Sequence, residues 1–304
     1  MIRRAVVVFG LIVAVLGVGV QAAQATWSVV AVDPETGEVG VAVASCVGFE
    51  VSVIPVLVPG VGAAASQAAI SEPSGMRIVE ALSGGASAAE TLDAVVAADD
   101  APGDRQFGVV VLDDGGAGWT GSDTFDVALD RRSTDGTASV QGNILVSEAV
   151  VASALAAFEA SDGDLPDRLL AALLAGADEG GDSRCGEQTA TSAALIVARP
   201  GDQSYSFTDA GVLGVDPTDS VVPSVFVSVL VVAGAERAPD RLAEVWASAD
   251  QDAATVAIRE IDEGADTTLE SARNVVLVLL GGVVALVVIV VFVVIRSKRR
   301  KQST

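Results

Sequence analysis

The order of extended and helical stretches constrains the fold of this 304-residue chain more than any other feature. Between residues 26 and 250, β-branched stretches form blocks that are separated by pairs of helical segments, and a final helix begins near Pro239. The blocks run strands, two helices, strands, two helices, strands, one helix. Separated blocks of this kind predict an α+β domain in which helices cover two sheets, rather than the strict alternation of a doubly wound fold.

The segments that carry this pattern are short and bounded by turn residues. We expect extended stretches at 26–32, 39–45, 51–58, 61–69, 107–112, 117–121, 140–145, 191–198, 204–215 and 221–232. Two helices follow residue 69, the second opening with a capping box at Ser87 and running to about residue 98. Further helices are expected at 147–160, at 165–177 and from 239 past Trp246.

Both ends of the chain carry apolar runs with flanking arginines or lysines. Residues 1–25 have the charged start, apolar run and A-x-A end of a secretory signal peptide. Residues 275–295 are apolar throughout and precede a basic tail at 296–304, which predicts a single membrane span with its C-terminus in the cytoplasm. A buried core helix is the alternative for this run. We therefore expect a plasma-membrane protein with an outer domain at 26–250 and an acidic stalk at 251–274.

Cleavage after Ala25 would make Thr26 the first residue of the mature chain. An N-terminal threonine carries a hydroxyl nucleophile and a free α-amine, and this pair can begin amide hydrolysis without a histidine. The simpler interpretation is that some residue must follow every cleavage site, and that threonine has no special role here.

Composition narrows the chemistry of the outer segment. Residues 26–274 hold all 40 acidic residues but only 11 of the 18 basic ones, because seven lie in the flanks, so the net charge is about −29. Such a field repels nucleic acid. The chain has no histidine, which excludes Ser-His-Asp catalysis and H-E-x-x-H metal sites. We expect no metal and no cofactor. The pattern G-x-G-x-x-G at 116–121 is better explained by a further strand than by a dinucleotide site, which needs a helix to begin there.

The first two strands form a predicted hairpin. The turn DPETGE at 33–38 joins them, so paired residue numbers should sum to about 71 and Thr26 should lie opposite Ser45. Ser45 is then a candidate to polarise the threonine hydroxyl, with an ordinary strand serine as the alternative.

Five segments resemble the domain-of-unknown-function 1028 family. They are TWSVVA at 26–31, DPETGE at 33–38, VGVAVAS at 39–45, VQGNIL at 140–145 and GGDSR at 180–184. The resemblance implies an N-terminal-nucleophile (Ntn) hydrolase-like fold, a four-layer αββα sandwich with threonine at the head of the first strand. Soluble relatives typically begin Met-Thr; in this chain signal-peptide removal would expose the same residue.

Threonine chemistry needs a base and a place for the oxyanion. The α-amine has a pKa near 8 and can take the hydroxyl proton. Asn143, beside Gly142, is the candidate oxyanion donor, and an asparagine that satisfies a turn is the alternative. The outer segment has no lysine, so a lysine-tuned amine is excluded.

The motif at 180–184 supplies the candidate substrate-binding residues. Arg184 can hold a substrate carboxylate and Asp182 can hold the arginine or the amine, whereas a loop salt bridge is the simpler interpretation. Cys46 should lie beside the nucleophile and Cys185 follows Arg184, so we expect a disulfide between them, with two free thiols as the alternative.

These features together predict a membrane-anchored N-terminal-threonine hydrolase of extracytoplasmic location. Its substrate would be a small amide or peptide-like compound, and the pattern sets no oligomeric state. The rival hypothesis is a catalytically silent binding or scaffolding domain on the same fold.

Overall fold

The computed structural model describes residues 25–49, 51–208, 211–212, 227–232, 236–248 and 256–261. All of them belong to one compact unit that ends at Ile261. Of the predicted leader at 1–25, only Ala25 is described, and the predicted span at 275–295 and tail at 296–304 lie outside the described residues. Within the described part of the chain, no helix combines the length and apolarity needed to cross a membrane.

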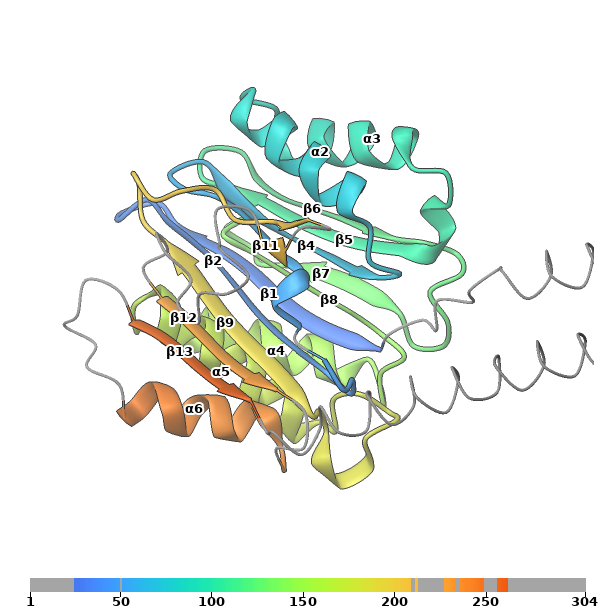
Figure 1. Ribbon diagram of the computed structural model, residues 1–304, viewed down its shortest axis with the longest axis vertical. Coiled ribbons are helices and arrows are strands. Elements are labelled where there is room, and N and C mark those ends of the chain that lie inside the picture. Colours follow the sequence, from blue (N-terminus) through green and yellow to red (C-terminus); the bar gives the residue numbers. More distant parts are fainter. Residues whose placement is uncertain are drawn as a thin grey trace, which may run out of the picture. The chain divides into compact units, whose positions relative to one another are not determined.

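Two β-sheets form the centre of this unit (Figure 1). The larger sheet has the order β13-β12-β9-β2-β1-β8-β7 and is antiparallel except between β12 and β13. Its strands are β1 (Thr26–Asp33), β2 (Glu38–Ser45), β7 (Leu129–Arg132), β8 (Ala138–Asn143), β9 (Ser192–Ala198), β12 (Val227–Val232) and β13 (Val256–Ile261). The first strand of the domain is therefore central and is paired on both sides.

The smaller sheet is an antiparallel meander in the order β3-β4-β5-β6. Its strands are β3 (Pro55–Val58), β4 (Gly62–Ala68), β5 (Arg105–Val111) and β6 (Gly115–Thr120). A two-stranded ribbon, β10 (Phe207–Thr208) and β11 (Gly211–Val212), follows an isolated bridge from Tyr205 to Leu57 on the edge strand β3.

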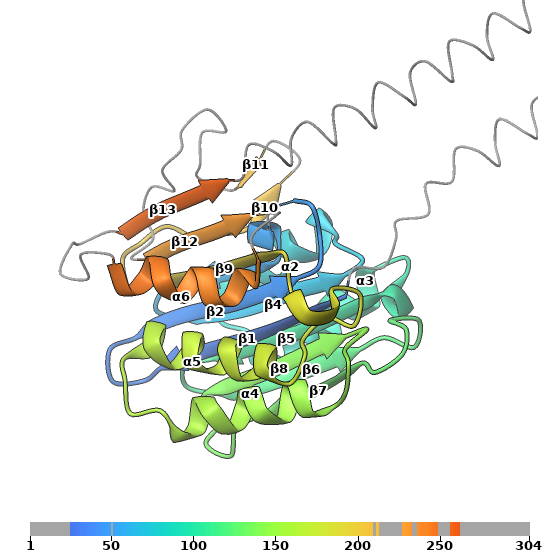
Figure 2. The ribbon, with the colours of Figure 1, turned by 90° about the horizontal axis from the view of Figure 1, so that it is seen from below.

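Helices cover the outer face of each sheet (Figure 2). The helices α4 (Ala149–Ala160), α5 (Leu165–Asp178) and α6 (Ala238–Ser248) pack on the larger sheet. The helices α2 (Glu72–Ser83) and α3 (Ala88–Ala98) pack on the smaller one. Since β1 and β2 contact β4 across the gap, the four layers follow one another as helix, sheet, sheet, helix.

Alternation along β1 shows how the sequence produces these layers. Trp27 and Val29 face the apolar cluster under α4 and α5, whereas Val30 and Val32 face the cluster between the two sheets. A third apolar cluster lies between the smaller sheet and α2 and α3. A strand that is apolar on both faces in this way is typical of a sheet buried on both sides.

The order of blocks and the α+β class agree with the sequence prediction. The register is also confirmed, because Thr26 pairs with Ser45 and the partners along the hairpin keep the same sum. The capping box predicted at Ser87 begins α3. The G-x-G-x-x-G stretch falls on strand β6, Gly115–Thr120, and does not start a helix.

Three segments differ from the prediction. The stretch at 51–58 begins with a 3-10 turn, Val51–Val53, and its strand starts only at Pro55, where proline suits a strand's first position. Strand β7 was not predicted, because its sequence LDRR lacks a strand pattern. Part of the expected stalk, Val256–Ile261, forms β13, which pairs in parallel with β12 as the sheet's edge strand.

Candidate active site

Polar residues from four neighbouring strands meet at one end of the larger sheet. Across β8, β1, β2 and β9, the backbone register aligns Asn143, Thr26, Ser45 and Ser192. All four residues are fully buried. Their neighbours at alternate positions, such as Val30 on β1 and Val43 on β2, face the space between the sheets. By strand periodicity this row of polar side chains points into the same space.

The carbonyl oxygen of Ala25 lies at the centre of this row's contacts. The Thr26 hydroxyl donates to Ser45 Oγ at 3.4 Å, and Ser45 Oγ in turn donates to the Ala25 oxygen. Arg184 Nη2 donates to the same oxygen at 3.2 Å. A hydroxyl and a guanidinium therefore converge on the carbonyl of the peptide bond that precedes Thr26.

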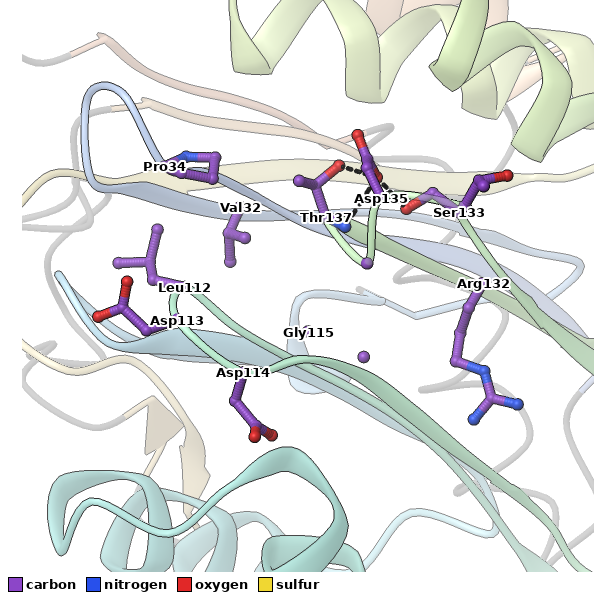
Figure 3. A pocket seen from close by; sticks show the side chains of 13 residues that line it. Val32, Pro34, Leu112, Asp113, Asp114, Gly115, Arg132, Ser133, Asp135 and Thr137 are labelled. Carbon is purple, nitrogen blue, oxygen red and sulfur yellow. Dashed lines mark hydrogen bonds between the residues drawn. The ribbon is translucent and has the colours of Figure 1, made fainter.

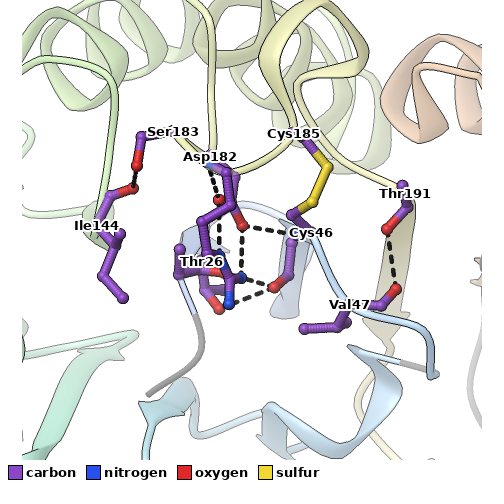
Figure 4. A network of polar contacts seen from close by, with 11 residues as sticks. Thr26, Cys46, Val47, Ile144, Asp182, Ser183, Cys185 and Thr191 are labelled. Atoms are coloured by element: carbon purple, nitrogen blue, oxygen red, sulfur yellow. Dashed lines mark hydrogen bonds and ion pairs between the residues drawn. A yellow bond between two sulfur atoms is a disulfide. The ribbon is translucent and has the colours of Figure 1, made fainter. Parts of the chain in front are cut away.

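The carboxylate of Asp182, labelled in Figure 4, holds the Arg184 guanidinium in position. This carboxylate is fully buried and accepts from Arg184 Nε at 3.1 Å and Nη2 at 2.8 Å. It also accepts from the backbone N–H groups of Arg184 and Cys46, at 2.9 and 2.7 Å. A buried carboxylate held by this many donors is a rigid support. The Asp182 carboxylate and the Ala25 carbonyl oxygen thus hold the Arg184 guanidinium in place. About a third of the Arg184 side chain remains exposed.

A disulfide joins Cys46 to Cys185 (Figure 4). The Cα atoms of the two cysteines are 5.6 Å apart. It links the end of β2 to the loop that carries Asp182 and Arg184. Gly181, immediately before Asp182, lies so close to Trp27 that a Cβ atom there would be 2.7 Å from the indole ring. The structure thus brings Thr26, Ser45, Asp182, Arg184 and both cysteines into one region.

Asn143 belongs to the same region but faces a different set of partners. Its Nδ2 donates to Gln106 Oε1 at 3.1 Å, and its Oδ1 is buried with no hydrogen-bond partner among the described residues. An amide carries two N–H groups. The predicted role of Asn143 as an oxyanion donor is therefore untested by these contacts.

A network of buried glutamines surrounds Asn143, and sequence reasoning missed it. Gln67, Gln106 and Gln141 come from β4, β5 and β8, and each is fully buried between the sheets. Gln67 Nε2 donates to Gln106 Oε1 at 2.8 Å, and the Ser28 hydroxyl donates to Gln67 Oε1 at 2.6 Å. A usable signal was present, since glutamine at an inward-facing strand position needs a buried partner.

Backbone strain gathers in the loops around this end. Ile144, directly after Asn143, has a φ of 53°, and Val127, whose carbonyl accepts from Leu145 N, has a φ of 49°. Thr189, whose carbonyl accepts from Asp182 N, has a φ of 59°. Positive φ is rare for β-branched residues and costs about 1–3 kcal/mol, and such outliers concentrate at functional sites.

Asp99 supports Arg105, the residue before Gln106. Its carboxylate accepts from Arg105 Nε at 3.0 Å, and Arg105 Nη1 donates to the Ala69 carbonyl at 2.7 Å. Burial alone would raise the pKa of Asp99, but hydrogen bonds from Arg105, Ala101 and Ser74 outweigh it and lower the pKa. The start of β5, and with it Gln106, is held by this ion pair.

An open cavity of about 590 Å³ lies at the other end of the sandwich (Figure 3). Three hairpin turns form its walls, at Val32 to Pro34, at Leu112 to Gly116 and at Arg132 to Thr137. Asp113, Asp114 and Asp135 give it an acidic rim. Within the described ranges, no cluster of three or more histidine, cysteine or acidic residues could hold a metal ion. Since β1 separates Val32 from Thr26, the cavity is roughly 20 Å from the polar row.

Comparison with known proteins identifies the family. A model of a family of unknown function, DUF1028, matches residues 26–222, so the chain belongs to that family. A crystal structure of a DUF1028 protein from Silicibacter pomeroyi is similar, with 24% identity and a TM-score of 0.58. This similarity covers 75% of the present chain and 91% of the other, and it concerns the fold. No curated protein matches the chain.

Proposed function

We propose that this protein is an N-terminal-threonine hydrolase of the Ntn type, which cleaves a small amide or related acyl bond. The observation that carries the proposal is the pair of donors, Ser45 Oγ and Arg184 Nη2, that converge on the Ala25 carbonyl oxygen beside the Thr26 hydroxyl. The helix–sheet–sheet–helix order and the position of Thr26 at the head of a central strand support the Ntn-like assignment.

Removal of residues 1–25 would release both donors and create the base. Ser45 and Arg184 would lose the Ala25 oxygen as acceptor, and a substrate carbonyl oxygen could take its position. The new α-amine of Thr26 lies on the same residue as the nucleophilic hydroxyl. Donors fixed at the position where negative charge develops stabilise a tetrahedral intermediate, and each contributes about 10²–10³-fold to turnover.

The reaction follows from these positions. The Thr26 α-amine takes the proton from Oγ as Oγ bonds to the substrate carbonyl carbon, and the oxyanion is held by Ser45 and Arg184. The intermediate collapses by breaking its C–N bond, and the leaving amine takes the proton from the α-ammonium. Water, deprotonated by the same amine, then attacks the carbonyl carbon of the Thr26 ester. The C–Oγ bond breaks, the α-ammonium returns its proton to Thr26 Oγ, and the acid is released.

The charge and burial of the supporting residues fit this chemistry. Asp182 is fully buried, and its contacts to Arg184 keep the guanidinium directed at the oxyanion position without a lysine. The outer segment has no lysine, so the amine is the natural base for the hydroxyl.

The direct test is an α,β-epoxyketone, which closes a ring by bonding to both a hydroxyl and the amine of the same residue. Intact-mass and peptide analysis of the mature full-length protein should locate the adduct on Thr26, with no residue before it. Thr26→Val keeps the amine and nearly the same shape, and it should form no adduct. A mature protein that starts at Thr26 yet forms no adduct would favour the binding-domain alternative.

We also propose that residues 275–295 anchor the domain outside the plasma membrane. The support is the apolar run and the basic tail behind it. Protease added to intact cells should degrade the outer domain and spare a tag placed after Thr304. Loss of that tag would reverse the proposed orientation.

A further inference from the structure

We infer that Asn143 holds the α-amine of Thr26 through its side-chain oxygen, and that the buried glutamines fix this orientation. This inference rests on the proposed function only in requiring that Thr26 be the first residue. It assigns Asn143 a positioning role, as an acceptor, in place of the oxyanion-donor role expected from the sequence.

The orientation of Gln106 is the first step. Gln106 Nε2 lies 2.9 Å from the Gly142 carbonyl oxygen and 3.2 Å from the Leu129 carbonyl oxygen. Carbonyl oxygens only accept hydrogen bonds, so the side-chain nitrogen of Gln106 must face them. Its oxygen, Oε1, therefore faces the other way and can only accept.

The partners of that oxygen follow from its orientation. Gln67 and Asn143 both approach Gln106 Oε1, at 2.8 and 3.1 Å, and each must present its nitrogen. Gln67 then directs its own oxygen to the Ser28 hydroxyl, which donates to it. The Ser28 oxygen accepts from Gln141 Nε2, and Gln141 Oε1 accepts from Ser139 at 3.0 Å. Each assignment along this chain agrees with the next.

A glycine makes room for the network. A Cβ atom at Gly108 on β5 would lie 1.9 Å from Gln141 Oε1. A side chain at Gly108 would therefore displace the Gln141 amide and reorganise its bonds to Ser28 and Ser139. The small sheet thus lacks a side chain where the large sheet needs space for its polar residues.

Asn143 is the last residue of this hydrogen-bonded network, and its side-chain oxygen is the acceptor that no donor meets in the described part of the chain. With Nδ2 directed at Gln106, its Oδ1 points away from Gln106, and it is buried without a hydrogen-bond partner among the described residues. Leaving a buried acceptor without a hydrogen bond destabilises the fold, so a donor is expected to meet it.

The nitrogen of Thr26 points towards β8, the strand that carries Asn143. Val32 N donates to the Thr137 carbonyl on the β8 side, and N–H groups alternate in direction along a strand, so Thr26 N also points towards β8 and its partner Asn143. A free α-ammonium has three N–H groups. One can continue the backbone pairing and a second can reach Asn143 Oδ1.

Asp182 and Arg184, which are paired with each other at 2.8 Å, lie at this end, and the Asp99–Arg105 ion pair and Asp130, which accepts from Thr120, lie on the Gln106 side. The aligned residues on β2, β8 and β9 are Ser45, Asn143 and Ser192, and none of them is charged. A neutral acceptor on the ammonium stabilises its charged form and raises its pKa. Asn143 would hold the amine so that its lone pair, once deprotonated, faces the neighbouring hydroxyl.

The test measures the Thr26 amine itself. Residues 26–274 contain no lysine, so reductive methylation of the mature full-length protein in detergent modifies only Thr26, Lys298 and Lys301. The two lysines serve as internal references. Asn143→Ala should lower the amine pKa and raise the Thr26 methylation rate below that pKa about 3- to 10-fold relative to the lysines.

Asn143→Asp is the conservative variant. Its carboxyl group keeps an acceptor oxygen towards Thr26, and a protonated carboxyl can still donate to Gln106 Oε1, but it lacks the second N–H of the amide. The acceptor role predicts a Thr26 pKa equal to or above that of the wild type. It also predicts β-lactone acylation of Thr26 within about fivefold of wild type, whereas an oxyanion-donor role predicts a loss of about 10²-fold or more.

These outcomes separate the two proposals. A methylation profile of Thr26 that is unchanged in Asn143→Ala, together with a collapse of acylation in Asn143→Asp, would overturn the acceptor role and favour the donor role. Methylation needs no catalysis, so the inference survives a wild-type protein that no β-lactone acylates, whereas the proposed function does not. A mature chain without a free Thr26 amine would overturn both.

Discussion

The two ends of the sandwich differ in how their contacts are made. At the cavity end, the turn at Asp135 is closed by local contacts, because Asp135 accepts from Ser133 and Thr137, two residues away on either side. At the Thr26 end, contacts join distant parts of the chain, such as Cys46 with Asp182 and Ala25 with Arg184. The open cavity belongs to the first end and the buried polar row to the second.

This difference argues against assigning the functional site to the open cavity on the basis of its volume. The turns around the cavity combine local bonds with single contacts to a nearby helix, since Asp114 accepts from Ala88 N of α3 and Thr134 N donates to Glu159 of α4. The Thr26 end needs β1, β2, β8, β9 and the loop after α5 to be in place together. A site built from so many separate elements is costly to maintain without a function, and the strained residues there support the same conclusion.

The largest effect should come from the nucleophile. Thr26→Ala keeps the amine and removes the hydroxyl, so β-lactone acylation and any turnover should fall about 10⁴–10⁶-fold. Thr26→Ser keeps both groups and should retain part of the rate. Asp113→Ala, at the cavity rim, should stay within twofold of wild type in the same assay. A cavity variant as damaging as Thr26→Ala would reverse the comparison of the two ends.

The disulfide should dominate the stability of the site end. The Cys46–Cys185 bond spans 139 residues, and on the chain-entropy model its loss removes about 5 kcal/mol from the free energy of unfolding. Urea unfolding of the Cys46→Ser, Cys185→Ser double variant should measure this loss. Reductant should reproduce it in wild type and leave the double variant unchanged. A change below about 1 kcal/mol would contradict the prediction.

Ser45 should contribute to rate more than to stability. Ser45→Ala removes one of the two donors on the proposed oxyanion position, so acylation of Thr26 should slow about 10²–10³-fold. Ser66→Ala is a matched control, because Ser66 Oγ is buried on β4 and lacks a hydrogen-bond partner among the described residues. It should acylate at the wild-type rate. Equal rates in both variants would remove Ser45 from the mechanism.

The smallest effect is expected at the cavity end. Burial alone would raise the pKa of Asp135, but hydrogen bonds from Ser133 and Thr137 outweigh it and lower the pKa. The carboxylate therefore stabilises the fold above its unfolded pKa near 4, and the contribution is lost as the pH falls through the lower folded value. Asp135→Ala should cost about 0.5–1 kcal/mol at pH 7, allowing for solvent screening at this exposed turn.

That loss should vanish in unfolding measurements below the folded pKa, where the carboxyl is protonated in both states. A difference between Asp135→Ala and wild type that is constant from pH 7 to acid would contradict the assignment. The same variant should leave acylation of Thr26 unchanged.

Local patterns in the sequence predicted most of the framework. The hairpin register followed from one turn, and the helix starts at Ser87 and near Leu165 followed from caps and periodicity. Strands β7 and β13 were missed, because the pattern LDRR is too polar and VAIREI lies in an acidic stretch. Both are edge strands of the larger sheet, where contacts with the neighbouring strand, rather than the intrinsic propensity of the residues, decide whether a strand forms.

The candidate site was predictable only in part. Ser45 followed from hairpin arithmetic, whereas the loop at Asp182 and Arg184 entered through family resemblance. The roles of Gln67 and Gln106 depend on contacts between two sheets, and a local pattern carries no information about which inward-facing residues meet across the gap. The convergence of Ser45 and Arg184 on Ala25 is a tertiary feature of the same kind.

The central position of β1 has a consequence for the timing of synthesis. Its partner β8 ends at Asn143, more than a hundred residues after β1 ends at Asp33. At about 5–20 residues per second, roughly 5–20 s pass before β8 exists. Until then the apolar hairpin of β1 and β2 has both edges unpaired, since β9, the other neighbour of β2, is made later still, and unpaired edges are templates for wrong pairing. The segment that would hold the nucleophile is thus among the first to leave the ribosome and among the last to find its neighbours.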